Sequence, residues 1–577
     1  FAKRLLDNLT AKIPVSFESL FIERSHSLCS YDLVIEFELT SNDTSVVTST
    51  EKKVFAVIQK ALGDRVKYFC ISRSDQAVKL NLILNPENCF RLATMGPTPD
   101  LTVEVESFRR LWGAKAELRK FDAGVVRCAV AWPELSEKRH MIVPQAVKHL
   151  LAHHKLIASG SRIKHQADSL DFILPNPSMQ KHQKPFSYFT EAFEALAGMI
   201  RSCSVLPLSV TQVVPISDCL RYTAFMPCTV EQRVAGPASP IVESLLVFER
   251  SAKWPNDLQA LRAAKHAFLL QLMRFLEKSS LPCSLDAQND YLDVFFKSLV
   301  FRFHIRLEKQ IRLLEAEGLK EKAKELGHLY NERPLLHAKL HSLATSNVVF
   351  GPTVRMVKRW LSAQMFSFIP DDLVETICGI VFAKQNPNSV LSAFYQCVKY
   401  LSMHQYNVPF VFDPDNQLDD GATLRDIQKD CSLTFYCAFL KDGKYNLPSW
   451  RIDEKTWKLL NKVATACLLM FDESGDSVDM RELLNPVLLE SKLISSIPVP
   501  ASNSVLHQSV KRQPEFLDKL VRTKSGGMAD FTRSLPGLLI IEAVAKHYSS
   551  EAIIFYDKYL GTLIGVHKGV TLTDLSQ

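Results

Sequence analysis

A basic amphipathic segment that leads into an apolar run is the feature that most constrains the fold of this chain. Phe108, Leu111 and Trp112 recur at i, i+3 and i+4, so their side chains share one face of a short helix. A turn at residues 122–124 follows, and the apolar run 125–132 suits a buried strand. The segment therefore predicts a helix, a turn and a strand with a dense cluster of cations, namely Arg109, Arg110, Lys115, Arg119 and Lys120.

Length and composition limit the class of protein. A chain of 577 residues is too long for one hydrophobic core, so we expect about three to five domains. With 47% hydrophobic and 23% charged residues it is typical of globular proteins, which argues against extensive disorder. No long uncharged apolar run occurs, so we expect no membrane span. The thirteen cysteines include no C-x-x-C pair, which favours reduced, buried thiols over a zinc site.

The net charge of +7 is modest, so the distribution of the cations matters more than their sum. A predicted helix carries a second cluster, Arg355, Lys358 and Arg359, beside Trp360. Any single cluster is more often a solvated helix face, and Arg119 and Arg359 could equally be buried ion-pair partners. A third cluster consists of Lys511, Arg512, Lys519, Arg522 and Lys524.

The hydrophobic pattern divides the chain into four parts: an α+β unit at 1–155, a strand-rich unit at 170–335, a helical unit at 336–500 and a small α/β unit at 501–577. In the second unit we expect a helix that starts near Trp254, with Asn256 as its N-cap. Phe295, Leu299 and Phe303 are spaced as on a helix, which predicts one long helix from Leu292 to Gly318.

Four sequence blocks resemble the Nrap family of nucleolar RNA-associated proteins, and they occur in the family's order. They are FRRLWGAKAELRKFDAG at 108–124, YLDVFFK at 291–297, FGPTVRMVKRWLSAQMFS at 350–367 and AIIFYDKY at 552–559. Two local departures are Ala123, where the family usually has a polar residue, and a tail after Val566 that lacks the usual tryptophan. The resemblance identifies the chain as the C-terminal half of a longer protein.

The resemblance implies an α+β multidomain fold. It contains a degenerate nucleotidyltransferase-like domain, a helical domain like that of poly(A) polymerases and oligoadenylate synthetases, and two small α/β domains. Active nucleotidyltransferases need a Gly-Ser turn, a D-x-D pair on a strand and a third carboxylate, because two metal ions neutralise the reacting oxygens. Residues 214–227 contain neither the turn nor paired carboxylates, and Glu243 and Glu249 have no evident partners. We therefore expect no catalytic residue, no metal site and no cofactor.

Other carboxylates and histidines are weaker candidates for a site. Asp168 and Asp171 follow a Gly-Ser pair, but a spacing of three places them on opposite faces of a strand. Asp32 and Glu36 could share a strand face but follow no Gly-Ser turn, and the Asp413-Pro-Asp415 segment suits a surface turn. The pairs His149/His153 and His337/His341 lack a third metal ligand, so solvated helix faces are the better interpretation.

The resemblance implies a nucleolar, non-catalytic scaffold of the small-subunit processome that binds pre-ribosomal RNA and assembly proteins. Candidate RNA contacts are Arg109, Arg110, Lys115, Arg119, Lys120, Arg355, Lys358 and Arg359. Two alternatives stay open from the sequence: an active RNA nucleotidyltransferase, and a protein-docking platform without RNA contact.

Overall fold

The computed structural model describes fifteen stretches of the chain. They are residues 31–38, 44–74, 77–121, 124–132, 136–157, 163–165, 184–225, 241–286, 290–415, 435–440, 452–474, 482–485, 496–498, 552–557 and 562–567. Two predicted features, the basic cluster at 511–524 and the Asp168/Asp171 pair, lie outside these residues. Within them no helix is both long and apolar enough to cross a membrane.

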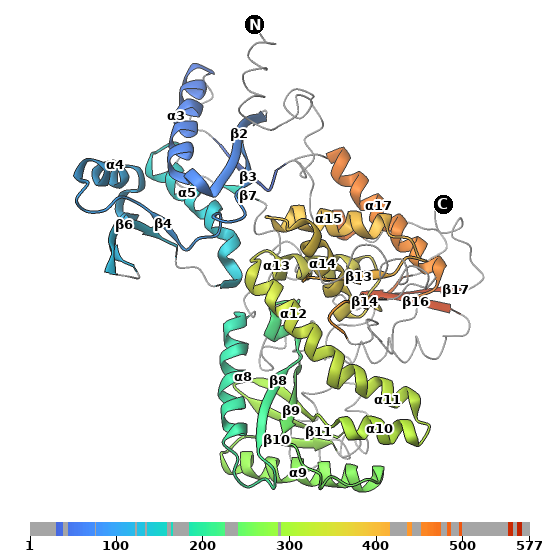
Figure 1. Cartoon of the computed structure of the whole chain (residues 1–577). Helices are drawn as coiled ribbons and strands as arrows, with labels where there is room; N and C mark the ends of the chain where they lie inside the picture. The colour runs from blue at the N-terminus through green and yellow to red at the C-terminus, as the bar shows by residue number, and fades with distance from the viewer. Residues whose placement is uncertain are drawn as a thin grey trace, which may run out of the picture.

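In its described residues the first unit has two antiparallel sheets and the helices α3, α4 and α5 (Figure 1). One sheet has the order β2-β3-β1-β7, and the other has the order β4-β6-β5. Trp112 and Trp132 are buried where the second sheet meets α4 and α5, as the apolar spacing from Phe108 to Trp132 predicts. The elements are β1 (Leu33–Phe37), α3 (Thr44–Leu62), β2 (Val66–Ser74), β3 (Ala77–Leu84), β4 (Ala93–Met95), α4 (Thr102–Trp112), β5 (Glu117–Lys120), β6 (Val126–Ala131), α5 (Ile142–His153) and β7 (Lys164–His165).

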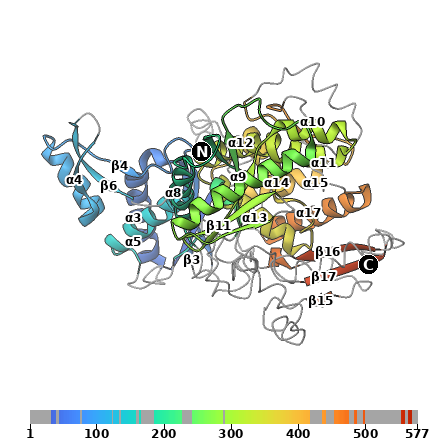
Figure 2. The ribbon, with the colours of Figure 1, turned by 90° about the horizontal axis from the view of Figure 1, so that it is seen from below.

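The second unit is a five-stranded sheet of order β10-β11-β12-β9-β8, with β9 and β12 parallel. Leu196 of α8 and Leu269 of α9 share one core with Val242 and Phe301 of the strands, so both helices cover the same sheet face. Figure 2 shows this unit from below, with α9 lying across the sheet. The elements are α8 (Phe186–Arg201), β8 (Val210–Pro215), β9 (Ile241–Phe248), α9 (Leu258–Lys278), β10 (Cys283–Asp286), β11 (Tyr291–Phe296), β12 (Leu299–Ile305), α10 (Glu308–Ala316) and α11 (Lys320–Gly327).

The long helix predicted from Leu292 to Gly318 is wrong. Residues 291–305 form the β11–β12 hairpin, in which Phe296 pairs with Leu299. Lys297 and Ser298 have φ values of 48° and 57°, so two consecutive residues in the left-handed region make a tight hairpin turn. A spacing of four residues is compatible with one strand face as well as with a helix, and this ambiguity caused the error.

The N-cap predicted for α9 is also displaced by one residue. Asp257, and not Asn256, accepts a hydrogen bond from the backbone N–H of Ala260 at 2.7 Å. The carboxylate therefore both caps the helix and interacts with the positive end of its dipole.

The third unit is helical, as predicted. Helix α13 lies at its centre, and Val354, Val357 and Trp360 are completely buried there. The elements are α12 (Arg333–Ser346), α13 (Phe350–Ala363), α14 (Asp371–Gln385), α15 (Val390–Met403), a parallel strand pair β13 (Phe410–Phe412) and β14 (Phe435–Cys437), and α17 (Glu454–Ser474).

A small C-terminal sheet of order β15-β17-β16 packs on the helical unit. Its strands are β15 (Ser496–Pro498), β16 (Ala552–Asp557) and β17 (Thr562–His567). The backbone of Tyr556 exchanges hydrogen bonds with Met365 and Ser367, just after α13. Strands β16 and β17 pair antiparallel, with Ala552 opposite His567. The four domain boundaries stay predictions.

A substitution at Gly351 would test the contact between the second and third units. A Cβ atom at this position would lie 2.7 Å from the backbone oxygen of Tyr222. We expect Gly351→Ala to lower the free energy of unfolding by about 1–3 kcal/mol, because neither backbone can move without disturbing its helix. Gly198→Ala is the control, since no atom lies within 4 Å of the position that its added Cβ would take. Thermal melting followed by circular dichroism would compare them, and equal melting temperatures would contradict the close contact.

Candidate functional site

A row of charged side chains crosses the centre of the five-stranded sheet. Asp293 on β11, Arg302 on β12 and Glu243 on β9 are direct register partners, so all three point to the same face. Because α8 and α9 cover the other face, this row lies on the sheet face that these two helices leave uncovered. Arg302 donates to both oxygens of Asp293, each at 2.9 Å.

The guanidinium of Arg302 stands between the two carboxylates of this row. Glu243 has its own cationic partner, Arg333 on α12, at 2.8 Å, with His304 at 3.8 Å. Burial opposes the charge of Glu243, but His304 and Arg333 lower its pKa below the ordinary value. A divalent ion needs several free oxygen ligands, whereas both carboxylates here are already neutralised. The residues present therefore do not fit a catalytic metal pair, and among the described residues no three acidic, histidine or cysteine side chains are grouped to hold a metal.

Sequence reasoning found only part of this row. It singled out Glu243 but missed Asp293 and Arg302, because the hairpin that carries them was taken for a helix. Glu249, the other carboxylate considered, lies beyond the end of β9 and accepts a hydrogen bond from the Ser209 hydroxyl at 2.8 Å. The three side chains are neighbours because of the pairing register between strands. The periodicity of a single strand does not reveal that register.

A buried ion-pair network joins the sheet unit to the helical unit. Arg221 follows β8 in a short 3-10 helix, Asp218–Arg221, and is 2% exposed. It donates to both oxygens of Glu375 on α14, at 2.5 and 3.0 Å, and to Asp372 at 2.6 Å. Burial opposes its charge, but Glu375 and Asp372 raise the pKa of Arg221 above the ordinary value. Arg333 lies 3.5 Å from Asp372, so the network continues to the charged row on the sheet.

Two of the predicted RNA contacts lie inside this buried core. The Lys358 ammonium is fully buried, 2.8 Å from Glu375 and 3.3 Å from Asp218. Arg359 donates to Asp557 of β16 at 2.8 Å, and Asp557 also accepts from the Ser362 hydroxyl at 2.6 Å. These side chains hold the units together and do not reach the surface, so they are removed from the proposed RNA contacts. The ion-pair alternative for Arg359 is the one that the structure shows.

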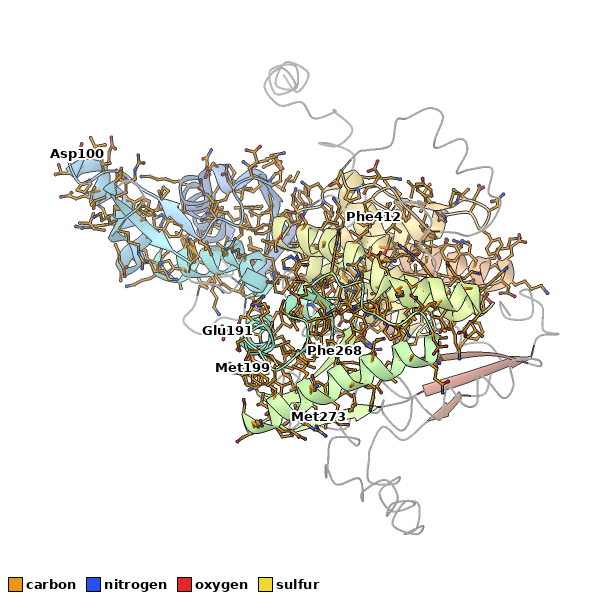
Figure 3. All side chains as sticks on the ribbon, turned by 60° about the horizontal axis from the view of Figure 1, so that its bottom comes forward. Asp100, Glu191, Met199, Phe268, Met273 and Phe412 are labelled. Carbon is orange, nitrogen blue, oxygen red and sulfur yellow. The ribbon has the colours of Figure 1, made fainter. Side chains whose placement is uncertain are left out.

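The first predicted cluster, in contrast, is exposed on a projecting part of the first unit. We call residues 93–131, which comprise α4 and the sheet β4-β6-β5, the basic arm. Figure 1 and Figure 2 both show it at the end of the unit farthest from the helical unit, and in Figure 3 the label of Asp100 marks its tip. All five predicted cations of the arm are exposed: Arg109, Arg110, Lys115, Arg119 and Lys120.

The basic arm also contains a cation that sequence reasoning missed. Arg127 on β6 is exposed and is the direct register partner of Arg119 on β5. No periodic signal in the sequence marks it, because β6 is exposed at Val126 and Arg127 and then buried from Cys128 to Val130. Arg110 and Arg119 have carboxylate neighbours, Glu106 at 3.3 Å and Glu117 at 2.9 Å, but exposed pairs of this kind are weak and leave the cations available.

Three histidines of the α5 C-terminal region attach α4 to the rest of the first unit. The Nε2 atoms of His149, His153 and His154 lie 2.8, 3.2 and 3.0 Å from the backbone oxygens of Trp112, Arg110 and Leu111, respectively. These carbonyls end α4 and have no partners within the helix, so each imidazole donates the missing hydrogen bond. The predicted solvated pair His149/His153 is therefore a structural clamp.

The solvated helix face predicted for His337/His341 is wrong for His337, which is buried and stacks on the ring of His341 with 6.0 Å between centroids. Asp32 accepts a hydrogen bond from the backbone N–H of Leu84 at 2.8 Å, and Asp415 pairs with Lys339. Arg355 is half-buried, with its guanidinium carbon 5.2 Å above the ring of Phe186.

Models of one family match three successive parts of the chain. The model described as Nrap protein domain 3 matches residues 27–155, the Nrap protein nucleotidyltransferase domain 4 matches residues 167–352, and the Nrap protein PAP/OAS1-like domain 5 matches residues 347–455. The fold is therefore nucleotidyltransferase-like, followed by a helical domain of the poly(A) polymerase type.

Curated relatives carry nucleolar names. Nucleolar protein 6 of Drosophila persimilis is 29% identical over 353 residues, which cover 55% of this chain and 29% of that protein. U3 small nucleolar RNA-associated protein 22 of Schizosaccharomyces pombe is 25% identical, covering 56% and 33%. Nucleolar protein 6 of Xenopus tropicalis is 26% identical, covering 89% and 50%. The chain thus spans at most half the length of these relatives.

Among solved structures, the chain is similar to the Cid1 poly(U) polymerase, with a TM-score of 0.34 and 8% identity. The match covers 55% of this chain and 99% of that one.

We expect that substitution of Glu375, which lies in the buried network, lowers the free energy of unfolding strongly. Glu375→Gln leaves Arg221 and Lys358 buried with one carboxylate fewer, and breaking such a pair destabilises by about 3–5 kcal/mol. We expect a lower melting temperature and faster hydrogen exchange in α14 and around residues 218–221. Glu106→Gln, which removes an exposed pair, is the control and should melt like the parent. Identical melting of the two variants would show that the network does not stabilise the contact between the units.

Proposed function

Because the chain belongs to the Nrap family, we propose that it is a non-catalytic scaffold of nucleolar ribosome assembly that grips pre-ribosomal RNA by its phosphates. The exposed basic arm is the observation that carries this proposal. The names of the relatives, which refer to the nucleolus and to the U3 small nucleolar RNA, support the setting in the small-subunit processome. Assembly proteins of that particle are the expected partners.

Phosphate binding suits the chemistry of the basic arm. Arginine and lysine on a convex, exposed surface contact the RNA backbone without reading base edges, and they position the molecule rather than select a sequence. Arg119 and Arg127 stand side by side on neighbouring strands, so two guanidiniums can approach successive phosphates. The three-histidine clamp holds the end of α4, which carries Arg109 and Arg110, against α5, and this reduces the entropy lost on binding.

The absence of catalysis is part of the same proposal. Metal-dependent nucleotide transfer needs carboxylates that are free to bind two ions, and Arg302 and Arg333 already neutralise Asp293 and Glu243. A fold built to hold the end of an RNA keeps its basic surfaces when these carboxylates are lost to ion pairs.

RNA affinity should depend on the basic arm and on salt. We expect Arg119→Gln/Lys120→Gln to weaken binding of a labelled single-stranded RNA and to reduce the slope of log K against log salt by about 1.4, or about 0.7 for each lost phosphate contact. Lys320→Gln/Lys322→Gln on α11 removes the same charge from an exposed surface of another unit and is the control. Fluorescence anisotropy measures both. A flat salt dependence of the parent would instead favour a protein-docking platform without RNA contact.

A transfer assay tests the catalytic alternative. With labelled nucleoside triphosphates, an RNA primer and magnesium or manganese, we expect no incorporation above a no-protein blank. If the chain did extend the primer, and if Asp293→Asn or Glu243→Gln abolished the extension, the chain would be an active nucleotidyltransferase and the proposal would be wrong.

A further inference from the structure

The basic arm offers no exposed ring on which an RNA base can stack. Its residues, 93–131, contain three aromatic side chains, Phe108, Trp112 and Phe121. Trp112 is 1% exposed and packs edge-on against Trp132, with 5.8 Å between the ring centroids. Phe108 and Phe121 are half-buried, and the ring of Phe108 lies 6.4 Å from that of Trp112. Proteins that hold single strands without sequence preference stack successive bases on aromatic rings, and the arm lacks such a platform.

Side chains that read base edges are also missing from the arm. Residues 93–131 contain no asparagine and no glutamine. The Ser107 hydroxyl accepts a hydrogen bond from Lys60 of α3 at 2.8 Å, and the Thr94 hydroxyl is buried and accepts from the indole N–H of Trp132 at 3.1 Å. Sequence-specific RNA recognition uses stacking and hydrogen bonds to unpaired bases. The arm is therefore suited to backbone contacts by its cations, and such contacts position an RNA without reading it.

The charges of the arm are separated along its length. Three carboxylates lie before or within the first half of α4, namely Asp100, Glu104 and Glu106. Residues 109–127 carry two carboxylates, Glu117 and Asp122, against six cations, namely Arg109, Arg110, Lys115, Arg119, Lys120 and Arg127. The positive surface is therefore formed by the C-terminal end of α4 and the β5–β6 pair, and not by the region around Asp100, which Figure 3 labels.

These cations project from a backbone that is held in place. Arg119 on β5 and Arg127 on β6 are direct register partners. The next residues of β6, Cys128, Ala129 and Val130, are completely buried. The three-histidine clamp holds the end of α4. A set of cations at fixed positions binds most favourably to phosphates that are also at fixed positions, because neither partner then loses much conformational freedom.

We infer that the basic arm binds double-stranded RNA in preference to single-stranded RNA, which rests on the proposed RNA-binding function and narrows it. A single strand must be ordered when it binds, and without aromatic rings the arm gains no base stacking that would offset this loss of entropy. An RNA duplex is already ordered, and it is recognised mainly through its shape, its phosphates and its 2′-hydroxyl groups. Its two strands also concentrate negative charge along one axis, which strengthens the attraction of cations.

Fluorescence anisotropy with the parent chain tests this preference. The probes are a short labelled RNA duplex of mixed sequence and each of its two separate strands, at the same salt concentration. We expect the duplex to bind about tenfold more tightly, a factor within the range of one base stack. Arg119→Gln/Arg127→Gln should lose most of this difference, whereas Lys320→Gln/Lys322→Gln on α11 should keep it.

A variant that supplies the missing ring tests the physical reason. Leu118 on β5 is 50% exposed and lies on the same strand face as Lys120, so Leu118→Trp places an aromatic ring beside a cation of the arm. Affinity for the single strands should rise about fivefold or more, and affinity for the duplex should stay within about twofold of the parent. Leu118→Ile is the size-matched control, and melting of each free variant checks that it is folded.

The outcomes separate this inference from the proposed function. If the single strands bind as tightly as the duplex, or if Arg119→Gln/Arg127→Gln weakens both by the same factor, the duplex preference is wrong and the RNA-binding function stands. If Leu118→Trp binds the single strands no better than Leu118→Ile does, missing base stacking is not the reason and the inference is wrong. If neither RNA binds in a salt-dependent manner, both proposals fail. Tighter binding of a DNA duplex of the same sequence would overturn the assignment to RNA.

Discussion

The sharing of Glu375 and Asp372 by Arg221 is the interaction on which the arrangement of the sheet and helical units depends. Three charged groups are removed from water at this point, and their burial is tolerable only because each has an oppositely charged partner at 2.5 to 3.0 Å. Lys358 and Arg333 extend the network on either side. The network therefore fixes the sheet unit against α14, and it favours one closed arrangement of the two units over any open one.

Ion pairs also neutralise the carboxylates on the face of the nucleotidyltransferase-like sheet that α8 and α9 leave uncovered. Asp293 on β11 and Glu243 on β9 lie on one face of the sheet, and Arg302 on β12, the strand between them, is the register partner of both. Arg302 pairs with Asp293 and Arg333 with Glu243, so each carboxylate has a cationic partner within the protein. The exposed cations proposed to bind RNA lie on the basic arm, so the part of the molecule that stabilises the fold and the part proposed to bind RNA are separate.

Helices and strands whose apolar residues recur at a regular spacing were predicted better from the sequence than the contacts between them. The helix that carries Phe108, Leu111 and Trp112 was correct, because burial on one face leaves a regular apolar spacing. The helix around Trp360 was also correct, although α13 is buried on nearly every side, and the strand predicted at 125–132 is exposed at Val125 and Val126. The β11–β12 hairpin was missed because its tight turn, Lys297-Ser298, has no glycine or asparagine. Lys358 is buried because carboxylates from other segments pair with it, and Arg127 lies beside Arg119 because of strand register. A single sequence reveals neither.

Anomalous diffraction from crystals soaked with manganese and a nucleoside triphosphate would test the central claim most directly. The charged row predicts no manganese peak near Glu243 and Asp293, with Arg302 still paired to Asp293. A manganese ion bound by these carboxylates, with Arg302 displaced, would show that the row is a working metal site and would contradict the account.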